Sequence, residues 1–360
     1  MFVFVGGMHG NEPAGVFALQ DLLAELELEQ LPLRGRLIAF AGNLEALRRG
    51  TRYLDADLNR LWSRADLALP HDVGPAAHER VTRDALLEEI EREIEGVTEP
   101  VIFLDLHSTS ASGSPFSIIG DTLQNRRIAF AFPVPVILGL EENVDGALLG
   151  YFGERGHVAV GFEGGQHDDE HTRANQLAAA WITLVVAGGL VQSETPQARR
   201  SFERLRDAGR GLPGVVEMRY RHHVTVRESF EMRPGFTNFD RVEAGEVLAS
   251  DRGSEIRAAE PGLVLLPLYQ GQGEDGFFLG REVRRFWLRV SSVLRALRVG
   301  ALLPYLPGVH RVEDEASELE VDHRVARVWV VEVFHLLGFR RRQESGRRLR
   351  FSRRVEGLRD

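Results

Sequence analysis

The stretch Met1-Phe-Val-Phe-Val-Gly-Gly-Met-His9-Gly-Asn-Glu12-Pro-Ala-Gly15 begins as an apolar strand and breaks into a glycine-rich turn that holds a histidine and a glutamate. A strand followed directly by a helical pattern is typical of an α/β sheet. Zinc is commonly bound by histidine nitrogens and a carboxylate oxygen, and a catalytic zinc has three protein ligands and one open position for water. His9 and Glu12 are therefore two candidate ligands, and one more is needed.

His107 is the best candidate for the third ligand. It ends another apolar run, Val101-Ile-Phe-Leu-Asp105-Leu-His107, and parallel strands bring groups from distant segments together at their carboxyl ends. Asp105 points the same way as His107 on an extended strand, so it could orient that ring or be an ordinary buried, hydrogen-bonded aspartate. The glycines around His9 would also suit a structural turn or a phosphate-binding loop. The G-x-G-x-x-G spacing is absent, which favours the metal site.

Composition limits the class of protein. With 360 residues, of which 43% are hydrophobic and 27% charged, the chain can form a sizeable core and is long enough for two domains. It contains no cysteine, which fits a reducing compartment and leaves His, Asp and Glu as metal ligands. All 44 basic residues are arginine, so a lysine Schiff base is excluded, and the net charge of −9 argues against nucleic-acid binding.

No apolar run could span a bilayer and no basic leader precedes the first strand, so we expect a cytoplasmic protein without a membrane partner.

Alternating strand and helix patterns in the first half predict an α/β sheet. The helix at 13–28 is expected to bury a stripe of Val16, Leu19, Leu23 and Leu26. Segments 192–200 and 209–214 have the composition of connections, which indicates a domain boundary. The other expected elements are strands at 3–5, 36–41, 101–106, 135–138 and 158–162, and helices around 85–94 and at 174–190.

The second half has a different pattern. Short β-like runs at 224–226, 246–249 and 262–268 predict a small all-β domain. Residues 339–360 carry nine arginines, and a solvated or partly disordered tail is a better interpretation than a nucleic-acid patch. A mixed apolar run at 327–337 precedes this tail, and segment 282–299 predicts an amphipathic helix with apolar Phe286, Val290, Val293, Leu294 and Leu297.

The segment 51–60, Thr-Arg-Tyr-Leu-Asp-Ala-Asp-Leu-Asn-Arg, carries groups suited to binding anions. Arg52 and Arg60 could bind an anionic substrate or a developing oxyanion through paired hydrogen bonds, and Asn59 could add a neutral donor. A turn with surface ion pairs is the alternative, and taken alone it is the better interpretation.

The segment 158–171 ends a strand with a carboxylate, Glu163, followed by Gly-Gly-Gln-His167 and, after three acidic residues, His171. Glu163 would suit a general base for a water molecule that a zinc ion activates. His167 and His171 could share a helix face, but the glutamate that follows the first histidine in H-E-x-x-H is missing. The acidic residues between them indicate a solvated helix start.

Taken together, the motifs G-G-x-H-G-N-E, T-R-Y-x-D-x-D-L-N-R, D-L-H-S-T and E-G-G-Q, in this order, resemble the succinylglutamate desuccinylase/aspartoacylase family, a branch of the zinc-carboxypeptidase clan. The resemblance covers about residues 1–190, and 234–248 looks like the start of that family's small C-terminal β domain. It implies an α/β fold with a zinc-carboxypeptidase-like mixed sheet flanked by helices. The expected domains are a zinc hydrolase catalytic domain at 1–192, a small β domain at 213–285 and an extension of unknown role with an arginine-rich tail at 286–360.

The resemblance also implies the roles of the site residues. It makes His9, Glu12 and His107 the ligands of one Zn²⁺ per chain, Glu163 the general base and acid, and Arg52 the group that polarises the scissile carbonyl. Asn59 and Arg60 would hold the carboxylate of a small anionic N-acyl amino acid, which the protein would hydrolyse as a zinc-dependent amidohydrolase.

Two departures from the family pattern leave the acyl group open. Where a tyrosine of the C-terminal domain reaches the substrate in the aspartoacylase branch, this chain has Phe277 and Phe278. Gly153 stands where a further substrate-binding arginine is expected, with Arg155 nearby. N-succinylglutamate, another N-acyl amino acid or a small peptide-like amide all remain open, as does a carboxypeptidase-like or ester-cleaving activity. A non-catalytic protein that binds metal or ligand is a further alternative, which the retention of Glu163 disfavours.

Overall fold

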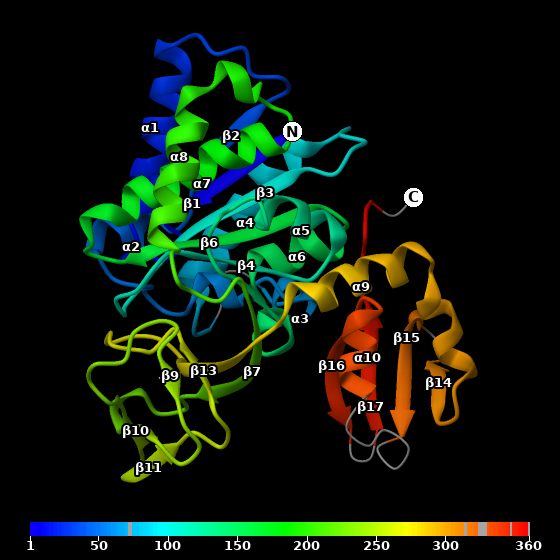
Figure 1. Cartoon of the computed structure of the whole chain (residues 1–360). Coiled ribbons are helices and arrows are strands. Elements are labelled where there is room, and N and C mark those ends of the chain that lie inside the picture. The colour runs from blue at the N-terminus through cyan, green and yellow to red at the C-terminus, as the bar shows by residue number, and fades with distance from the viewer. Residues whose placement is uncertain (71–73, 313–314, 323–329, 346–347, 359–360) are drawn as a thin grey trace.

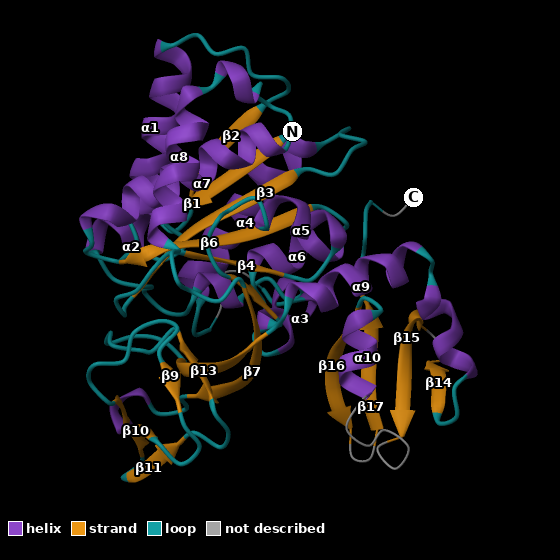
Figure 2. Cartoon of the chain, in the orientation of Figure 1, coloured by secondary structure: helices purple, strands orange, loops and turns teal. Residues whose placement is uncertain are grey.

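The computed structural model describes all residues except 71–73, 313–314, 323–329, 346–347 and 359–360. In this described part, ten strands form one mixed sheet in the order β2-β1-β3-β6-β4-β5-β7-β13-β12-β9 (Figures 1 and 2). Strand β4 runs antiparallel to β6, whereas β2, β1, β3 and β6 run parallel to one another. In this order the strands are Leu37–Ala41, Phe2–Gly6, Ile102–Thr109, Val158–Gln166, Phe116–Ile119, Val136–Leu138, Val215–His223, Asp275–Glu282, Gly262–Leu265 and Arg241–Val242.

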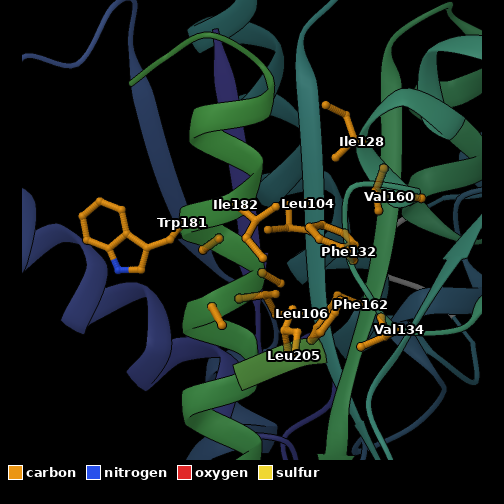
Figure 3. Close-up of a cluster of buried hydrophobic side chains, with 14 of the residues drawn as sticks. Leu104, Leu106, Ile128, Phe132, Val134, Val160, Phe162, Trp181, Ile182 and Leu205 are labelled. Atoms are coloured by element: carbon orange, nitrogen blue, oxygen red, sulfur yellow. The ribbon is translucent and has the colours of Figure 1, made fainter. Parts of the chain in front are cut away.

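Helices cover both faces of the first half of this sheet. Phe2 and Phe4 of β1 pack into one core cluster, and Val3 and Val5 pack into another on the opposite face, as the two-residue period of a strand requires. The first cluster (Figure 3) joins the sheet to helices α1, α5, α7 and α8, and the second joins it to α4 and α6. The bounds are α1 Ala14–Leu28, α4 Ala77–Ile94, α5 Leu123–Ala129, α6 Leu148–Glu154, α7 Glu170–Val186 and α8 Pro196–Ala208. Burial on both faces explains why the strand sequences are nearly continuous apolar runs.

Short helices complete the connections of this part. They are α2 Leu44–Arg49, η1 Leu58–Arg60, α3 Arg64–Leu67, η2 Leu140–Glu142 and η3 Gln192–Glu194. None of the helices among the described residues is both long and apolar enough to cross a membrane.

The β-rich part begins with β7, which pairs with β5 of the α/β part and with β13. The central sheet therefore continues into it without a break. A small three-stranded sheet packs beside it in the order β11 Ser254–Arg257, β10 Val247–Asp251 and β8 Phe230–Met232, and η4 spans Arg227–Ser229. Its core is a separate apolar cluster that includes Phe230, Leu248 and Phe277.

Residues after the β-rich part form a third unit. It contains α9 Arg285–Ala296, η5 Val299–Tyr305, α10 Val330–Leu336 and a four-stranded antiparallel sheet (Figure 1). The sheet order is β14 Val309–Val312, β15 Glu315–Asp322, β17 Arg348–Arg353 and β16 Phe339–Ser345.

Charged groups join this third unit to the α/β part. Asp121 pairs with Arg126 at 2.5 Å and with Arg295 of α9 at 2.6 Å. Arg354 contacts Glu141 and Glu142 at 2.8 and 2.9 Å, and all of these side chains are mostly buried. The third unit is therefore docked on the α/β part rather than tethered beside it.

Several sequence predictions were wrong. The segment after Gln192 is not a connection throughout, because Pro196 starts helix α8, whose Leu205 is fully buried. In α1 the buried residues are Gly15, Ala18, Leu19 and Leu22, while Leu23 is 41% exposed. Helix α1 packs closely on β3, and a Cβ on Gly15 would come within 3.0 Å of the backbone oxygen of Leu106. This close packing requires a small residue on the buried face.

The predictions for the later segments also need correction. Residues 224–226 follow strand β7 rather than form a strand, and the tail at 339–360 contains β16 and β17. In β17, Leu349 and Phe351 are buried whereas Arg348 and Arg350 pair with Glu320, so the arginines alternate with core residues. The run at 327–337 forms α10 from Val330, and its first three residues lie outside the described part.

Candidate active site

Strand register brings the predicted site residues to one edge of the sheet. Strands β1, β3 and β6 are adjacent and parallel, so their carboxyl ends meet. His107 of β3 is the register partner of Glu163 of β6. His9 and Glu12 lie in the turn that follows β1, where a Cβ on Gly10 would come within 2.0 Å of the backbone of Ala46. Only glycine permits this close approach, which packs the turn against helix α2.

His9, Glu12 and His107 form a buried cluster. Their candidate ligand atoms all lie within 4.8 Å of one another. The Nδ1 atom of His9 is 2.8 Å from Oε1 of Glu12, and the Nδ1 atom of His107 is 3.0 Å from Oε2 of the same carboxylate. Two imidazole nitrogens and one carboxylate oxygen therefore face a common point.

The opposite nitrogen of each imidazole contacts another carboxylate. Nε2 of His9 is 3.0 Å from Oδ1 of Asp57, and Nε2 of His107 is 2.8 Å from Oδ2 of Asp105. A proton held on each Nε2 by these carboxylates leaves the Nδ1 lone pairs free to bind a cation. Asp105 is thus in contact with His107, as an orienting role for this carboxylate requires.

The charges of the cluster also fit a divalent metal ion. Burial opposes ionisation of Glu12 and Asp57, but the neighbouring His9 and, for Asp57, Arg52 hold their pKa values well below the usual range. Burial likewise opposes a charged His107, yet Asp105 and Glu12 raise the pKa of this ring well above its ordinary value. A buried site rich in carboxylates attracts cations. The three-residue donor set is the one that catalytic zinc sites use.

Arg52 lies against this cluster. Its guanidinium donates to Oδ2 of Asp57 at 2.8 Å, and it approaches Nε2 of His9 at 2.9 Å and Oε1 of Glu12 at 3.4 Å. Burial opposes its charge, but Asp57 and Glu12 raise its pKa, so Arg52 stays positively charged. The segment 51–60 is therefore not a surface turn with solvent-exposed ion pairs.

Asn59 and Arg60 follow Asp57 in helix η1. Asn59 accepts a hydrogen bond from the backbone N–H of Leu148 at 2.9 Å, and its Nδ2 is 3.4 Å from Nε2 of His107. Arg60 donates to Oδ2 of Asp275 at 2.7 Å, and Asp275 also accepts from Arg221 at 2.5 Å. Asp275 comes from β13, so the β-rich part supplies a carboxylate to the arginine that was expected to hold a substrate.

Glu163 is buried beside the cluster. Burial raises its pKa to about 8, with Glu12 adding to the effect and His107 opposing it. Its Oε2 atom is buried and has no hydrogen-bond partner among the described residues. A carboxyl group with a free oxygen and a pKa near neutrality is suited to taking up and returning a proton.

Several residues near this site were not predicted from the sequence. Asp57 received no role, although it contacts both His9 and Arg52. His167 does not lie at a solvated helix start, because its ring is 2.8 Å from Oγ of Ser108 and 3.0 Å from Oε1 of Gln270. Gln270 belongs to the β-rich part, and a loop glutamine carries no sequence signal for such a contact.

The phenylalanines of β13 do not reach the site. Phe277 is fully buried in the apolar cluster of the β-rich part, and Phe278 is fully buried in another cluster that also contains Phe116 and Ile137 of the α/β part. His171, by contrast, is exposed at the start of α7, as expected. The side chain that β13 contributes near Arg60 is Asp275, two positions before Phe277.

The first half of the chain matches a known protein family. The sequence model of the "Succinylglutamate desuccinylase/Aspartoacylase catalytic domain" matches residues 2–184. A succinylglutamate desuccinylase of Yersinia enterocolitica is 47% identical over 60 residues, which are 17% of this chain and 18% of that protein. The aligned segment thus spans less than a fifth of the relative's length.

Solved structures share the fold. A succinylglutamate desuccinylase from Vibrio cholerae gives a TM-score of 0.58 at 19% identity, covering 79% of this chain and 81% of that one. Murine aminoacylase 3 gives a TM-score of 0.51 at 15% identity, covering 78% and 95%. At these identities the likeness concerns the fold, while the family is established by the match over residues 2–184. The chain belongs to the succinylglutamate desuccinylase/aspartoacylase family.

Proposed function

We propose that this protein is a zinc-dependent amidohydrolase that releases an amino acid from an N-acyl amino acid. The observation that carries the proposal is the convergence of Nδ1 of His9, Nδ1 of His107 and the Glu12 carboxylate next to the buried carboxyl group of Glu163. Family membership supports the same chemistry, since named relatives include a succinylglutamate desuccinylase and an aminoacylase.

His9, Glu12 and His107 would hold one zinc ion, which polarises a carbonyl group and lowers the pKa of a nearby water molecule. Asp57 and Asp105 keep both imidazole rings in the orientation that presents Nδ1. Glu163 would remove a proton from the attacking water and return it to the leaving amine. Its free oxygen and its pKa of about 8 support this role.

Arg52 would stabilise the negative charge that develops on the acyl oxygen. Its guanidinium is held beside His9 and Glu12 by Asp57, so the positive charge is already in place when the substrate binds. A fixed charge in a buried site stabilises a transition state without the cost of reorganisation.

Asn59 and Arg60 would bind the carboxylate of the substrate, with Arg60 exchanging its contact to Asp275 for the ligand. The proposed substrate is a small anionic N-acyl amino acid or a similar carboxylate. Because the chain has no cysteine, we also propose that it acts in the reducing environment of the cytoplasm.

Two measurements on the purified protein test the proposal. Metal analysis is expected to find one zinc per chain, and a panel of N-acyl amino acids that includes N-succinylglutamate and N-acetylaspartate is expected to yield free amino acid. The panel also contains C-terminal peptides and ester analogues, because a carboxypeptidase-like or ester-cleaving activity uses the same groups. Zinc without turnover of any member would instead favour a non-catalytic binding protein.

A further inference from the structure

Helix α9 has an unusual distribution of polar and apolar residues. Its buried face carries Ser291 and Arg295, which bond to the α/β part and α10: Ser291 receives a hydrogen bond from Arg126, and Arg295 contacts Asp121 at 2.6 Å. Several of the apolar residues lie on the other side of the helix. Phe286, Val293 and Leu297 are 63%, 58% and 71% exposed. The sequence prediction of an amphipathic helix was correct, but the apolar face points to solvent.

These residues form one continuous stripe. Phe286, Val290, Val293 and Leu297 are separated by four, three and four positions, which is the spacing of a single helix face. Trp287, next to Phe286, is also half exposed, and η5, which follows α9 in the chain, carries the exposed residues Leu302 and Tyr305. We call this surface the α9 stripe. Monomeric proteins seldom expose large contiguous apolar surfaces, and such surfaces mark sites of interaction.

Arginines surround the α9 stripe. Arg285 and Arg289, four positions apart, line one side of it, and Arg284 and Arg298 stand at its two ends; all four are exposed. None of them forms an ion pair with a residue that the structure describes. Residues 283–312 contain no aspartate or glutamate, although the whole chain has 53 acidic residues and a net charge of −9. The region is therefore strongly basic within an acidic protein.

We propose that the α9 stripe docks the protein on an anionic lipid surface. Aromatic and aliphatic side chains would enter the headgroup boundary, and the flanking arginines would contact the anionic headgroups, as in interfacial amphipathic helices. This proposal changes the expectation, drawn from the sequence, that the protein has no membrane partner. That expectation rested on the absence of a segment that could span a bilayer. A helix that lies in the interface needs none.

A second copy of the chain fits this face less well. A two-fold symmetric pair brings the same surface of both copies together. The arginines of one copy would then meet those of the other, and residues 283–312 offer no carboxylate to compensate their charge. An anionic partner is favoured for the same reason.

Co-sedimentation of the full chain with lipid vesicles tests the proposal. We expect binding to vesicles of equal parts phosphatidylglycerol and phosphatidylcholine, weaker binding at high salt, and none to phosphatidylcholine alone. The variant F286S/V293S/L297S should lose binding. The variant R285Q/R289Q should bind about 25-fold more weakly, since each arginine near such a surface contributes a factor of about five. Quenching of Trp287 by brominated lipid should disappear in Trp287→Phe while binding persists.

The matched control is F202S/V81S/L28S, which removes one phenylalanine, one valine and one leucine that are exposed on other elements. It should bind as the wild type does, and all variants should keep the wild-type melting temperature. Failure of the wild type to bind the anionic vesicles would overturn the proposal, as would equal binding by the stripe variant and the control. A concentration-dependent dimer in sedimentation velocity that only the stripe variant loses would assign the surface to a second copy and also overturn it.

Discussion

His107 and Glu163 are register partners at the carboxyl ends of the parallel strands β3 and β6. One strand thus carries a proposed metal ligand and its neighbour carries a proposed general base, at the edge where His9 and Glu12 follow β1. The distance between His107 and Glu163 is set by the spacing of adjacent strands in the sheet, not by a flexible loop. Each function can therefore be removed without the other.

Glu163→Gln tests this separation. The amide keeps the size of the side chain but cannot accept a proton from water, so we expect turnover to fall by about 10² to 10⁴. Zinc content should be unchanged, because Glu163 is not one of the three proposed ligands. Metal analysis and amine release are measured on the same preparation. Wild-type turnover by a zinc-loaded Glu163→Gln protein would show that another group acts as the base.

Asp105→Asn addresses the orientation of His107. The carboxylate is 2.8 Å from Nε2 of His107, and loss of such a partner weakens metal binding by about 10- to 100-fold. Competition with a chelator measures the change. Asp207→Asn, on an exposed residue of α8, serves as the control. Equal zinc affinity in the two variants would limit Asp105 to a packing role.

The candidate cluster could be predicted from the sequence because each of its residues lies near the carboxyl end of an apolar strand or in the turn that follows one. Strong apolar runs located β1, β3 and β6, and parallel strands necessarily bring their carboxyl ends together. The three proposed ligands and Glu163 follow from these two facts and the family motifs. The candidate roles of Arg52 and Asn59 came from their side-chain chemistry and the family motif rather than from a strand, since residues 51–60 contain no strand or long helix.

The surroundings of the site could not be predicted in this way. Asp275 and Gln270 reach the site from the β-rich part, and their contacts depend on how β7 continues the central sheet. The amphipathic helix α9 was predicted correctly, but hydrophobic periodicity identifies an apolar stripe without showing what lies against it, so the exposure of this stripe could not be predicted. Buried Arg295 pairs with Asp121, which is far away in the sequence. This ion pair places the Arg295 face of α9, rather than the apolar stripe, against the α/β part.

Asp275 offers a test of substrate binding. Its carboxylate contacts Arg60 at 2.7 Å and would compete with a substrate carboxylate for the same guanidinium. We therefore expect Asp275→Asn to lower KM for anionic N-acyl amino acids by about tenfold, whereas Arg60→Gln should raise it by a similar factor. Steady-state kinetics with acidic and neutral N-acyl amino acids measures both. If both variants raise KM equally, Asp275 positions Arg60 instead of competing with substrate.

The contacts of His335 predict that the protein loses stability at alkaline pH. Its Nε2 is 3.1 Å from Oε2 of Glu142 and its Nδ1 is 3.1 Å from Oε1 of Glu217, so both nitrogens donate only when the ring is charged. Burial opposes this charge, but the two carboxylates raise the pKa of His335 to about 9. A raised folded-state pKa gives stability that is complete below the unfolded value near 6.5 and is lost as the pH rises through about 9.

Thermal melting of the wild type between pH 6 and pH 10, set beside His335→Gln, measures this contribution. We expect the variant to be less stable by about 2 kcal/mol at pH 6, where it leaves two carboxylates without their cation, and to approach the wild type near pH 10. His310→Gln changes an exposed histidine of β14 and should follow the wild-type curve. A constant difference between wild type and His335→Gln across this range would mean that His335 contributes packing rather than charge. A difference that shrinks as the pH rises from about 6.5 through about 9 would instead show that His335, in α10, pairs in its charged form with Glu142 and Glu217.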